Sequence, residues 1–258
     1  MENIILQKSN GIATITFNRP QVFNAFDKAM RDEMLGALDD CQNDATVRCV
    51  LITGAGKAFC SGTDIAEISS DNPPSFEAIL DGGYNAIVLK IRHLEKPVVA
   101  AVNGVAAGAG ANLALACDIV IAHENAKFIQ SFTKIGLIPD SGGTWLLPRL
   151  VGFAKASAMM LLGESISAKD AETLGMIYKC VHTEGYADFV NQITTQLANM
   201  PTQALALTKL AINASLFEGL ENQLLKETQW QGKSGSTADY KEGVTAFLEK
   251  RQPKFEGK

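Results

Sequence analysis

The sequence predicts an α/β protein whose chain ends in a helical region, and three observations support this. Short apolar runs alternate with helical patterns up to Pro139, which is typical of the α/β class. Beyond Pro139, helical patterns dominate. The 258 residues, of which 47 % are hydrophobic, can bury a large core without disulfides or metals. We therefore expect an α/β core over residues 1–200 and a helical region over residues 201–258.

The first expected elements are a hairpin, a helix and a strand. Residues 4–7 and 12–17 are apolar or alternating runs that flank Ser9-Asn10-Gly11, a sequence typical of a hairpin turn. Asp27 is a suitable N-cap, and the apolar spacing after it predicts a helix. The apolar run Cys49–Thr53, closed by glycines, predicts a short buried strand.

The middle of the chain repeats the alternation of helix and strand. Residues 69–74 are polar and contain two prolines, which predicts a mobile loop. The elements expected after this loop are a helix to about Leu94, the strand Val98–Val102, the helix Ala107–Ala116, the strand Ile119–Ala122 and a strand beginning at Phe128.

The last part of the chain is expected to be helical apart from one strand, Ile177–Val181. Apolar periodicity predicts seven helices there. Their ranges are Thr144–Leu150, Ala154–Leu162, Ala168–Leu174, Tyr186–Met200, Gln203–Ala214, Leu220–Trp230 and Ala238–Glu249.

Composition excludes several classes of partner and location. The net charge is −5 and no block of like charges is present, which argues against nucleic acid or an anionic membrane as the main partner. No signal-peptide pattern opens the sequence, and no run reaches the ~20 apolar residues of a membrane helix. The five cysteines are scattered without a CxxC pair, as free thiols in a reducing compartment would be. We expect a cytoplasmic protein.

Several familiar sites are not supported. Gly54-Ala55-Gly56-Lys57 lacks the spacing and the hydroxyl of a phosphate-binding loop, and the glycines from Gly104 to Gly110 do not follow the dinucleotide-binding spacing. The three histidines lie far apart without partners at metal-ligand spacing, so no metal site is expected. No GxSxG elbow is present. The sequence offers no obvious nucleophile, metal or redox cofactor.

Two loop-to-helix junctions remain as candidates for chemistry. Residues 57–65 and 103–110 each follow a short buried strand and are dense in small side chains. Small residues let a ligand approach the backbone, and helix N-termini leave amide groups unpaired. Two such amides aimed at one point would hold an oxyanion. Composition alone leaves open the alternative that glycine and alanine serve only for tight packing.

Longer motifs in these junctions resemble those of the crotonase (enoyl-CoA hydratase/isomerase) superfamily. They are FCSGTDI at residues 59–65 and VNGVAAGAGANLALACD at residues 102–118. The resemblance covers nearly the whole chain. It also includes Arg19-Pro20 with Asn24-Ala25-Phe26, Lys96-Pro97, Gly136-Leu137-Ile138-Pro139, Gly142-Gly143-Thr144 and the closing Phe247-Leu248-Glu249-Lys250-Arg251.

The resemblance implies a fold, a substrate and a site. The fold would be a superhelix of ββα turns, with a C-terminal helical region that builds homotrimers or dimers of trimers. The substrate would be an acyl-CoA thioester, so coenzyme A is part of the substrate and no separate cofactor is expected. The amides of Thr63 and Ala109 would form the oxyanion hole. Substrate-binding positions would be Ala25, Phe26, Ser61, Gly62, Asp64, Ile65, Gly108, Asn112, Phe132 and Gly143.

The resemblance also bears on the reaction. Hydratases of this family use two glutamates, and the matching positions here are Asn112 and Phe132, neither of which can transfer a proton. A carboxylate stands instead at Asp140, where its alternatives are a helix N-cap or an acid/base group. Asp140 matches the acid position of family members that isomerise 1,2-epoxyphenylacetyl-CoA, and of the peroxisomal type that shift a 3-enoyl double bond to position 2.

Three functions stay open at this point. The first is an isomerase that forms a thioester enolate with Asp140 as acid and base. The second is a hydratase whose water is held by Asn112 and activated by Asp140. The third is a non-catalytic acyl-CoA binder. For Phe132 and its apolar neighbours, the alternatives are an acyl pocket or ordinary core packing.

Overall fold

The computed structural model describes all 258 residues and contains two sheets. The six-stranded sheet has the order β1-β2-β3-β5-β7-β10, and the four-stranded sheet has the order β4-β6-β8-β9. The first sheet comprises β1 (Ile4–Ser9), β2 (Ile12–Phe17), β3 (Cys49–Gly54), β5 (Val98–Val102), β7 (Ile119–His123) and β10 (Lys179–Val181). The second comprises β4 (Ala58–Cys60), β6 (Val105–Ala107), β8 (Lys127–Ile129) and β9 (Ser165–Ser167).

The expected hairpin opens the larger sheet. Strands β1 and β2 pair antiparallel, and the turn residues Asn10 and Gly11 have φ angles of 52° and 77°, which Asn and Gly tolerate best. The other strands of this sheet pair parallel. Helix α1 (Lys28–Asn43) begins where expected, because the Asp27 side chain accepts a hydrogen bond from Met30 N at 2.8 Å. Helix α9 (Tyr186–Ala198) packs against β2, β3 and β7.

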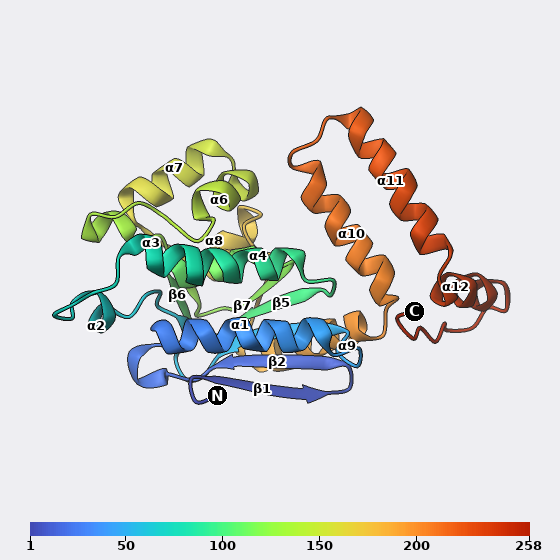
Figure 1. The fold of residues 1–258 in the computed structure, drawn as a ribbon, viewed down its shortest axis with the longest axis horizontal. Helices are drawn as coiled ribbons and strands as arrows, with labels where there is room; N and C mark the ends of the chain where they lie inside the picture. The colour runs from blue at the N-terminus through green and yellow to red at the C-terminus, as the bar shows by residue number, and fades with distance from the viewer.

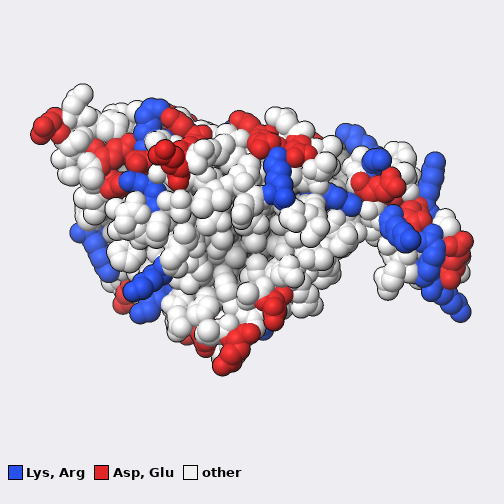
Figure 2. Space-filling view, turned by 90° about the horizontal axis from the view of Figure 1, so that it is seen from below, with Lys and Arg blue, Asp and Glu red and all other residues white.

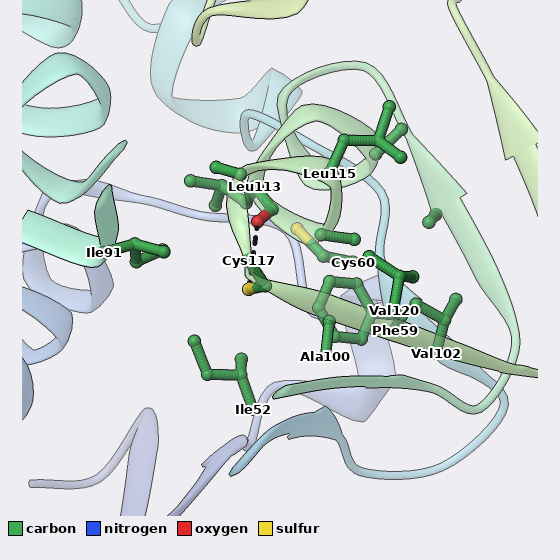
Figure 3. Packing of buried hydrophobic residues seen from close by; sticks show 14 of the residues in the cluster. Ile52, Phe59, Cys60, Ile91, Ala100, Val102, Leu113, Leu115, Cys117 and Val120 are labelled. Atoms are coloured by element: carbon green, nitrogen blue, oxygen red, sulfur yellow. Dashed lines mark hydrogen bonds between the residues drawn. The ribbon is translucent and has the colours of Figure 1, made fainter. Parts of the chain in front are cut away.

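Two predictions for the smaller sheet were wrong. Residues 105–107 form β6, so Ala107, expected as the first residue of a helix, ends a strand instead, and residues 165–167 form β9, which was not predicted. Helix α5 (Ala109–Ala116) is therefore shorter than expected, and every one of its residues is buried. Figure 3 shows Leu113 and Leu115 of α5 in the same apolar cluster as Phe59 and Val102. This helix passes through the core.

A helical segment before β5 contains a wide turn. Helix α3 (Phe76–Ile79) continues through a π-helical turn at Leu80–Tyr84 into α4 (Asn85–His93). π-turns are rare and often lie at functional sites. The short helix α2 (Ile65–Ile68) precedes this segment, and residues 69–75 between them have no regular structure.

The helices after Pro139 follow the expected order. They are α6 (Gly143–Val151), α7 (Phe153–Leu162), α8 (Ala168–Thr173), α9, α10 (Thr202–Ser215), α11 (Leu220–Gly235) and α12 (Ala238–Leu248). Helices α10 to α12 extend away from the sheets, at the right of Figure 1. Lys209 joins α10 to the core, because its Nζ lies 2.7 Å from Ile91 O and 2.8 Å from Asp118 Oδ2.

Charges of both signs are mixed on the surface. Figure 2 shows them interspersed around the rim of one face, with a broad uncharged area in the middle. None of the helices combines the length and the apolar character needed to cross a bilayer.

Candidate active site

The two small-residue junctions lie side by side. Helix α5 packs so closely on β4 that a Cβ atom added at Gly110 would lie 2.4 Å from Cys60 O. Two residues beyond β4, a Cβ added at Gly62 would lie 3.4 Å from Ala109 N, and Gly62 has a φ of 97°. Glycine is therefore required at both positions. The absence of these two side chains brings the Thr63 junction against the first residue of α5.

The backbone N–H groups of Thr63 and Ala109 are free to donate hydrogen bonds to a ligand. Phe26 N donates to Gly62 O at 2.8 Å and Asp64 N donates to Phe26 O at 2.9 Å, so the carbonyl of the Gly62–Thr63 peptide and the amide of the Thr63–Asp64 peptide are both bonded. The Thr63 N–H between them donates to no protein acceptor. Ala109 is the first residue of α5, where amides have no intrahelical acceptor. Gly108 before it has φ 53° and ψ −129°, a conformation that essentially only glycine adopts.

Asp140 lies in the turn that leads into α6, and its side chain does not cap that helix. The N-cap is Gly142, which makes no side-chain cap hydrogen bond. The alternative of a helix cap is therefore wrong. The Asp140 carboxylate instead accepts a hydrogen bond from Ser141 Oγ at 2.7 Å. Burial raises the pKa of Asp140 above its ordinary value, and the hydrogen bond from Ser141 partly opposes that rise.

The turn that carries Asp140 is backbone-strained. Ser141 has a φ of 50° and is 1 % exposed, and Gly142 follows with a φ of 77°. A buried serine in the left-handed region costs free energy, and such residues cluster at functional sites. This conformation places the Ser141 hydroxyl against the carboxylate.

Asn112 connects the Asp140 turn to α5. Its Nδ2 donates to Asp140 O at 2.8 Å, and its Oδ1 accepts from Gln130 Nε2 at 2.8 Å. Asn112 is 0 % exposed. Gly143 makes room for it, because a Cβ added there would lie 2.3 Å from Asn112 Nδ2. Both polar ends of Asn112 are thus engaged, which differs from the expected role of holding a water.

Phe132 and Tyr84 line the same interior. A Cβ added at Gly108 would lie 3.7 Å from Phe132 Cζ, so this ring sits beside the oxyanion junction. Tyr84 is 0 % exposed, and its Oη accepts a hydrogen bond from Thr63 Oγ1 at 3.1 Å. The pKa of Tyr84 is raised well above its ordinary value, chiefly by burial, with Asp140 among the charges that contribute.

The expected coenzyme A positions separate into two groups. Ala25 and Phe26 are buried, and the Phe26 ring packs edge-on against Phe17 with centroids 5.0 Å apart. Phe26 thus supports Thr63 from the core, and its ring is not free to contact a ligand. Ile65, by contrast, is 68 % exposed at the start of α2.

The remaining two expected positions, Ser61 and Asp64, are half-buried and hydrogen-bonded. The Ser61 hydroxyl donates to Val22 O at 3.3 Å. Asp64 caps α2 through Ala66 N at 3.0 Å and pairs with Arg19 at 2.9 Å.

Three residues of this site carry little or no signal in the sequence, namely Tyr84, Gln130 and Ser141. Tyr84 lies in a helical stretch and resembles any aromatic residue of a core helix. Gln130 carries a weak signal, a polar residue directly after the buried strand β8. Ser141 stands next to the predicted acid, and only its backbone conformation sets it apart.

Comparisons with known proteins find relatives along nearly the whole chain. The sequence profile described as enoyl-CoA hydratase/isomerase matches residues 7–258. A 1,2-epoxyphenylacetyl-CoA isomerase of Escherichia coli K12 is 46 % identical over 261 residues and covers 100 % of both chains. A short-chain-enoyl-CoA hydratase of Clostridium acetobutylicum is 36 % identical and covers 100 % of this chain and 98 % of its own.

Solved structures have the same fold. The crystal structure of an enoyl-CoA hydratase from Bacillus anthracis superimposes with a TM-score of 0.95 at 32 % identity, covering 99 % of this chain and 100 % of its own. A putative enoyl-CoA hydratase/isomerase from Mycobacterium abscessus superimposes with a TM-score of 0.92 at 36 % identity, covering 99 % and 100 %. The crotonase fold expected from the motifs is confirmed.

Proposed function

The chain belongs to the enoyl-CoA hydratase/isomerase family, and from that premise we propose that it is an acyl-CoA isomerase with Asp140 as its acid and base. The observation that carries the proposal is that Asp140, a partly buried carboxylate, lies in a turn hydrogen-bonded to the helix that begins with Ala109. Asp140 is bonded through its carbonyl to Asn112, one helical turn beyond Ala109 on α5. The positions of the two hydratase glutamates hold Asn112 and Phe132.

The reaction needs one proton carrier. The thioester carbonyl oxygen lies between the amides of Thr63 and Ala109, which stabilise negative charge as it develops. Asp140 removes a proton from the α-carbon of a 3-enoyl-CoA, and the electron pair moves through the carbonyl to form the enolate. Asp140 then returns the proton to the γ-carbon, which moves the double bond to position 2. A ring 1,2-epoxide begins with the same enolate; the epoxide ring then opens, and Asp140 returns the proton to a ring carbon in place of the γ-carbon.

The surroundings of Asp140 suit this task. A general base works best when its pKa approaches the operating pH, and burial shifts Asp140 in that direction. The hydrogen bond from Ser141 fixes the orientation of the carboxylate. Phe132 places a buried apolar ring beside Gly108 at the oxyanion junction, which disfavours a bound water.

Hydration is less well supported, although the 36 %-identical relative from Clostridium is named a hydratase. Addition of water across a 2-enoyl-CoA requires a group that holds the water and a second proton carrier. Asn112 is buried with both polar ends bonded, and Phe132 has no proton to give.

The remaining expectations for ligand and assembly are part of the proposal. Ala25, Ser61, Asp64 and Ile65 lie along the Thr63 junction and form the coenzyme A side of the site. We propose homotrimers or dimers of trimers built by α10 to α12, which sedimentation analysis would measure. These helices carry several exposed apolar side chains, namely Ile212, Leu220, Leu224, Leu225, Tyr240, Val244, Phe247 and Leu248.

A substrate comparison tests the reaction. Purified protein is incubated separately with a 3-enoyl-CoA and a 2-enoyl-CoA while the ultraviolet absorbance of the conjugated thioester is followed. An isomerase raises the absorbance with the first substrate and leaves the second unchanged. Loss of absorbance with the 2-enoyl-CoA would show hydration and overturn the proposal. If neither substrate reacts, a ring-epoxidised phenylacetyl-CoA is tested next. Absence of turnover with that substrate as well would overturn the proposal and favour a non-catalytic acyl-CoA binder.

The acid is tested by Asp140→Asn. The amide keeps the shape of the side chain but cannot accept a proton, so kcat should fall by about 10²–10⁴-fold while acyl-CoA affinity is retained. Asp188→Asn, at an exposed position of α9, is the matched control and should retain full activity. Turnover of Asp140→Asn close to that of the control would show that Asp140 is not the base.

A further inference from the structure

Thr63 is held through its side chain as well as through its neighbouring peptides. Its hydroxyl is 3.1 Å from the Oη of Tyr84, the last residue of the π-helical turn. Tyr84 is 0 % exposed, so this hydrogen bond forms in the interior. The wide turn thus carries an aromatic hydroxyl to the junction that supplies one of the two oxyanion amides.

Tyr84 is itself fixed on two sides. The Phe26 ring lies against it with centroids 5.9 Å apart, and the Arg31 guanidinium lies 5.7 Å from the centre of its ring. Arg31 can approach because the neighbouring residue is a glycine. A Cβ added at Gly83 would lie 2.6 Å from Arg31 Cδ. The phenol therefore has little freedom to move away from Thr63.

Arg31 links Tyr84 back to the Thr63 junction through Glu67. Its Nη1 and Nη2 donate to the two carboxylate oxygens of Glu67 at 2.8 Å and 2.7 Å. Both side chains are largely buried, and such two-pronged pairs have a defined geometry. Glu67 belongs to α2, whose N-cap is Asp64, directly after Thr63. The contacts form a closed ring: Thr63, Tyr84, Arg31, Glu67 and back along α2.

This closed ring of contacts is important because the Thr63 N–H donates no hydrogen bond within the protein. An oxyanion donor stabilises the transition state only if it is aimed before the charge develops. The Thr63 N–H has no protein acceptor to fix its direction, so its orientation depends on what holds the rest of the residue. One support is the bridge between Phe26 and Thr63, and the other is the hydroxyl bond to Tyr84.

We propose that Tyr84 is a positioning residue of the oxyanion hole, which aims the Thr63 amide through the Thr63 hydroxyl, with Arg31 and Glu67 bracing it. This inference rests on the proposed role of the Thr63 amide. It assigns catalytic importance to a buried tyrosine and an ion pair that do not contact the reacting atoms.

A double-mutant cycle tests the connection. Tyr84→Phe removes only the phenol oxygen, and Thr63→Val removes only the hydroxyl while keeping the amide and the branched shape. Each should lower kcat by about five- to tenfold, the effect of one neutral hydrogen bond, with the affinity for a saturated acyl-CoA unchanged. The double variant should be no slower than either single one, and Thr63→Ser should recover most of what Thr63→Val loses.

Two further measurements separate positioning from a general structural effect. Tyr186→Phe is the matched control, because Tyr186 Oη is also buried but packs on the other side of the larger sheet. It should leave kcat unchanged. The second readout is the absorbance of a bound 2-enoyl-CoA, whose band moves to longer wavelength when hydrogen bonds polarise the thioester carbonyl. Tyr84→Phe should reduce this shift.

The outcomes distinguish this inference from the proposed reaction. If wild-type protein shifts the absorbance band but turns over neither a 3-enoyl-CoA nor a ring-epoxidised phenylacetyl-CoA, the reaction proposal fails, and the loss of the shift in Tyr84→Phe still supports the inference. Additive effects in the cycle, or a full shift in Tyr84→Phe, would refute it. Absence of any shift in the wild-type protein would refute it as well, because no hole would exist to be positioned.

Discussion

Asn112 is expected to stabilise the core and to fix the position of Asp140. Replacing Asn112 therefore tests its contribution to the free energy of unfolding and its contribution to kcat. In Asn112→Ala two side-chain hydrogen bonds are lost, to Asp140 O and from Gln130 Nε2. Each contributes about 1 kcal/mol, and the buried Gln130 amide, whose Oε1 already has no partner, costs about 1 kcal/mol or more when left unbonded. The free energy of unfolding should therefore fall by about 3 kcal/mol.

The same change should slow catalysis beyond its effect on stability. Without Asn112, the Asp140 carbonyl keeps only its bond from Gly143 N, at 2.8 Å within the same turn. The turn is then free to move relative to α5. A displacement of about 1 Å can cost roughly a hundredfold in rate. We expect kcat to fall by about ten- to a hundredfold under conditions where the variant is fully folded.

Urea unfolding and initial rates are the two measurements. Gln223→Ala is the control, since it removes another buried side-chain amide, bonded to Ala211 O at 3.1 Å in the C-terminal helices. It should cost about 1 kcal/mol of stability with kcat unchanged. If Asn112→Ala unfolds like the wild type, or loses stability without losing kcat, the assigned connection between α5 and the acid is wrong.

Three further predictions follow from the site and its supports. Ser141→Ala removes the hydrogen bond that opposes the rise in the pKa of Asp140, so the acidic limb of the kcat/KM profile, where the base becomes protonated, should move to higher pH; an unmoved limb would assign it to another group. Gly108→Ala places a side chain on a backbone conformation that L residues rarely adopt, which costs about 1–3 kcal/mol of strain and should lower kcat strongly. The control Gly136→Ala is at a left-handed position with open space around it and should leave kcat unchanged. Equal kcat values for the two variants would contradict the requirement for glycine at position 108. Lys209→Met removes the closer of the two cations beside the half-buried Asp118, where α10 joins the core, and leaves only Arg92 at 3.9 Å; it should cost about 3 kcal/mol, read from thermal or urea unfolding.

The burial of Asp140 also has a consequence for stability. Its folded-state pKa lies above the unfolded value, so the native state binds more protons between the two, and stability falls as the pH rises through that window. At neutral pH the charged carboxylate is therefore a cost. Asp140→Asn, proposed above as the inactive variant, should consequently be more stable than wild type at neutral pH, with the gain shrinking on acidification.

The sequence was sufficient for elements with a strong local signal. The strand Cys49–Gly54 is a continuous apolar run, and Asp27 is placed one residue before α1 with the side chain that caps it. The strands β6 and β9 have three residues each, too few for an alternating pattern to be read. Their existence depends on the neighbouring strand that they pair with, which local sequence does not encode.

The site was predictable only in part, for the same reason. Runs of small residues indicated the two junctions, because close backbone approach needs glycine or alanine. What those junctions are bonded to depends on distant parts of the chain: Asn112 and Asp140 are 28 residues apart, and Thr63 and Tyr84 are 21 apart. Phe26 was expected to bind substrate, yet its ring lies in the core while its backbone supports Thr63.

Helix α5 carries both halves of the proposed chemistry on one stiff segment. Ala109 begins the helix, and Asn112, one turn later, grips the loop that bears the acid. The distance between the oxyanion amide and the Asp140 turn is therefore fixed by one buried helix and does not depend on the relative positions of two loops. During thermal motion of the protein, the oxyanion hole and Asp140 should therefore move as one unit. Their relative geometry should be kept while other parts of the pocket open to admit the thioester.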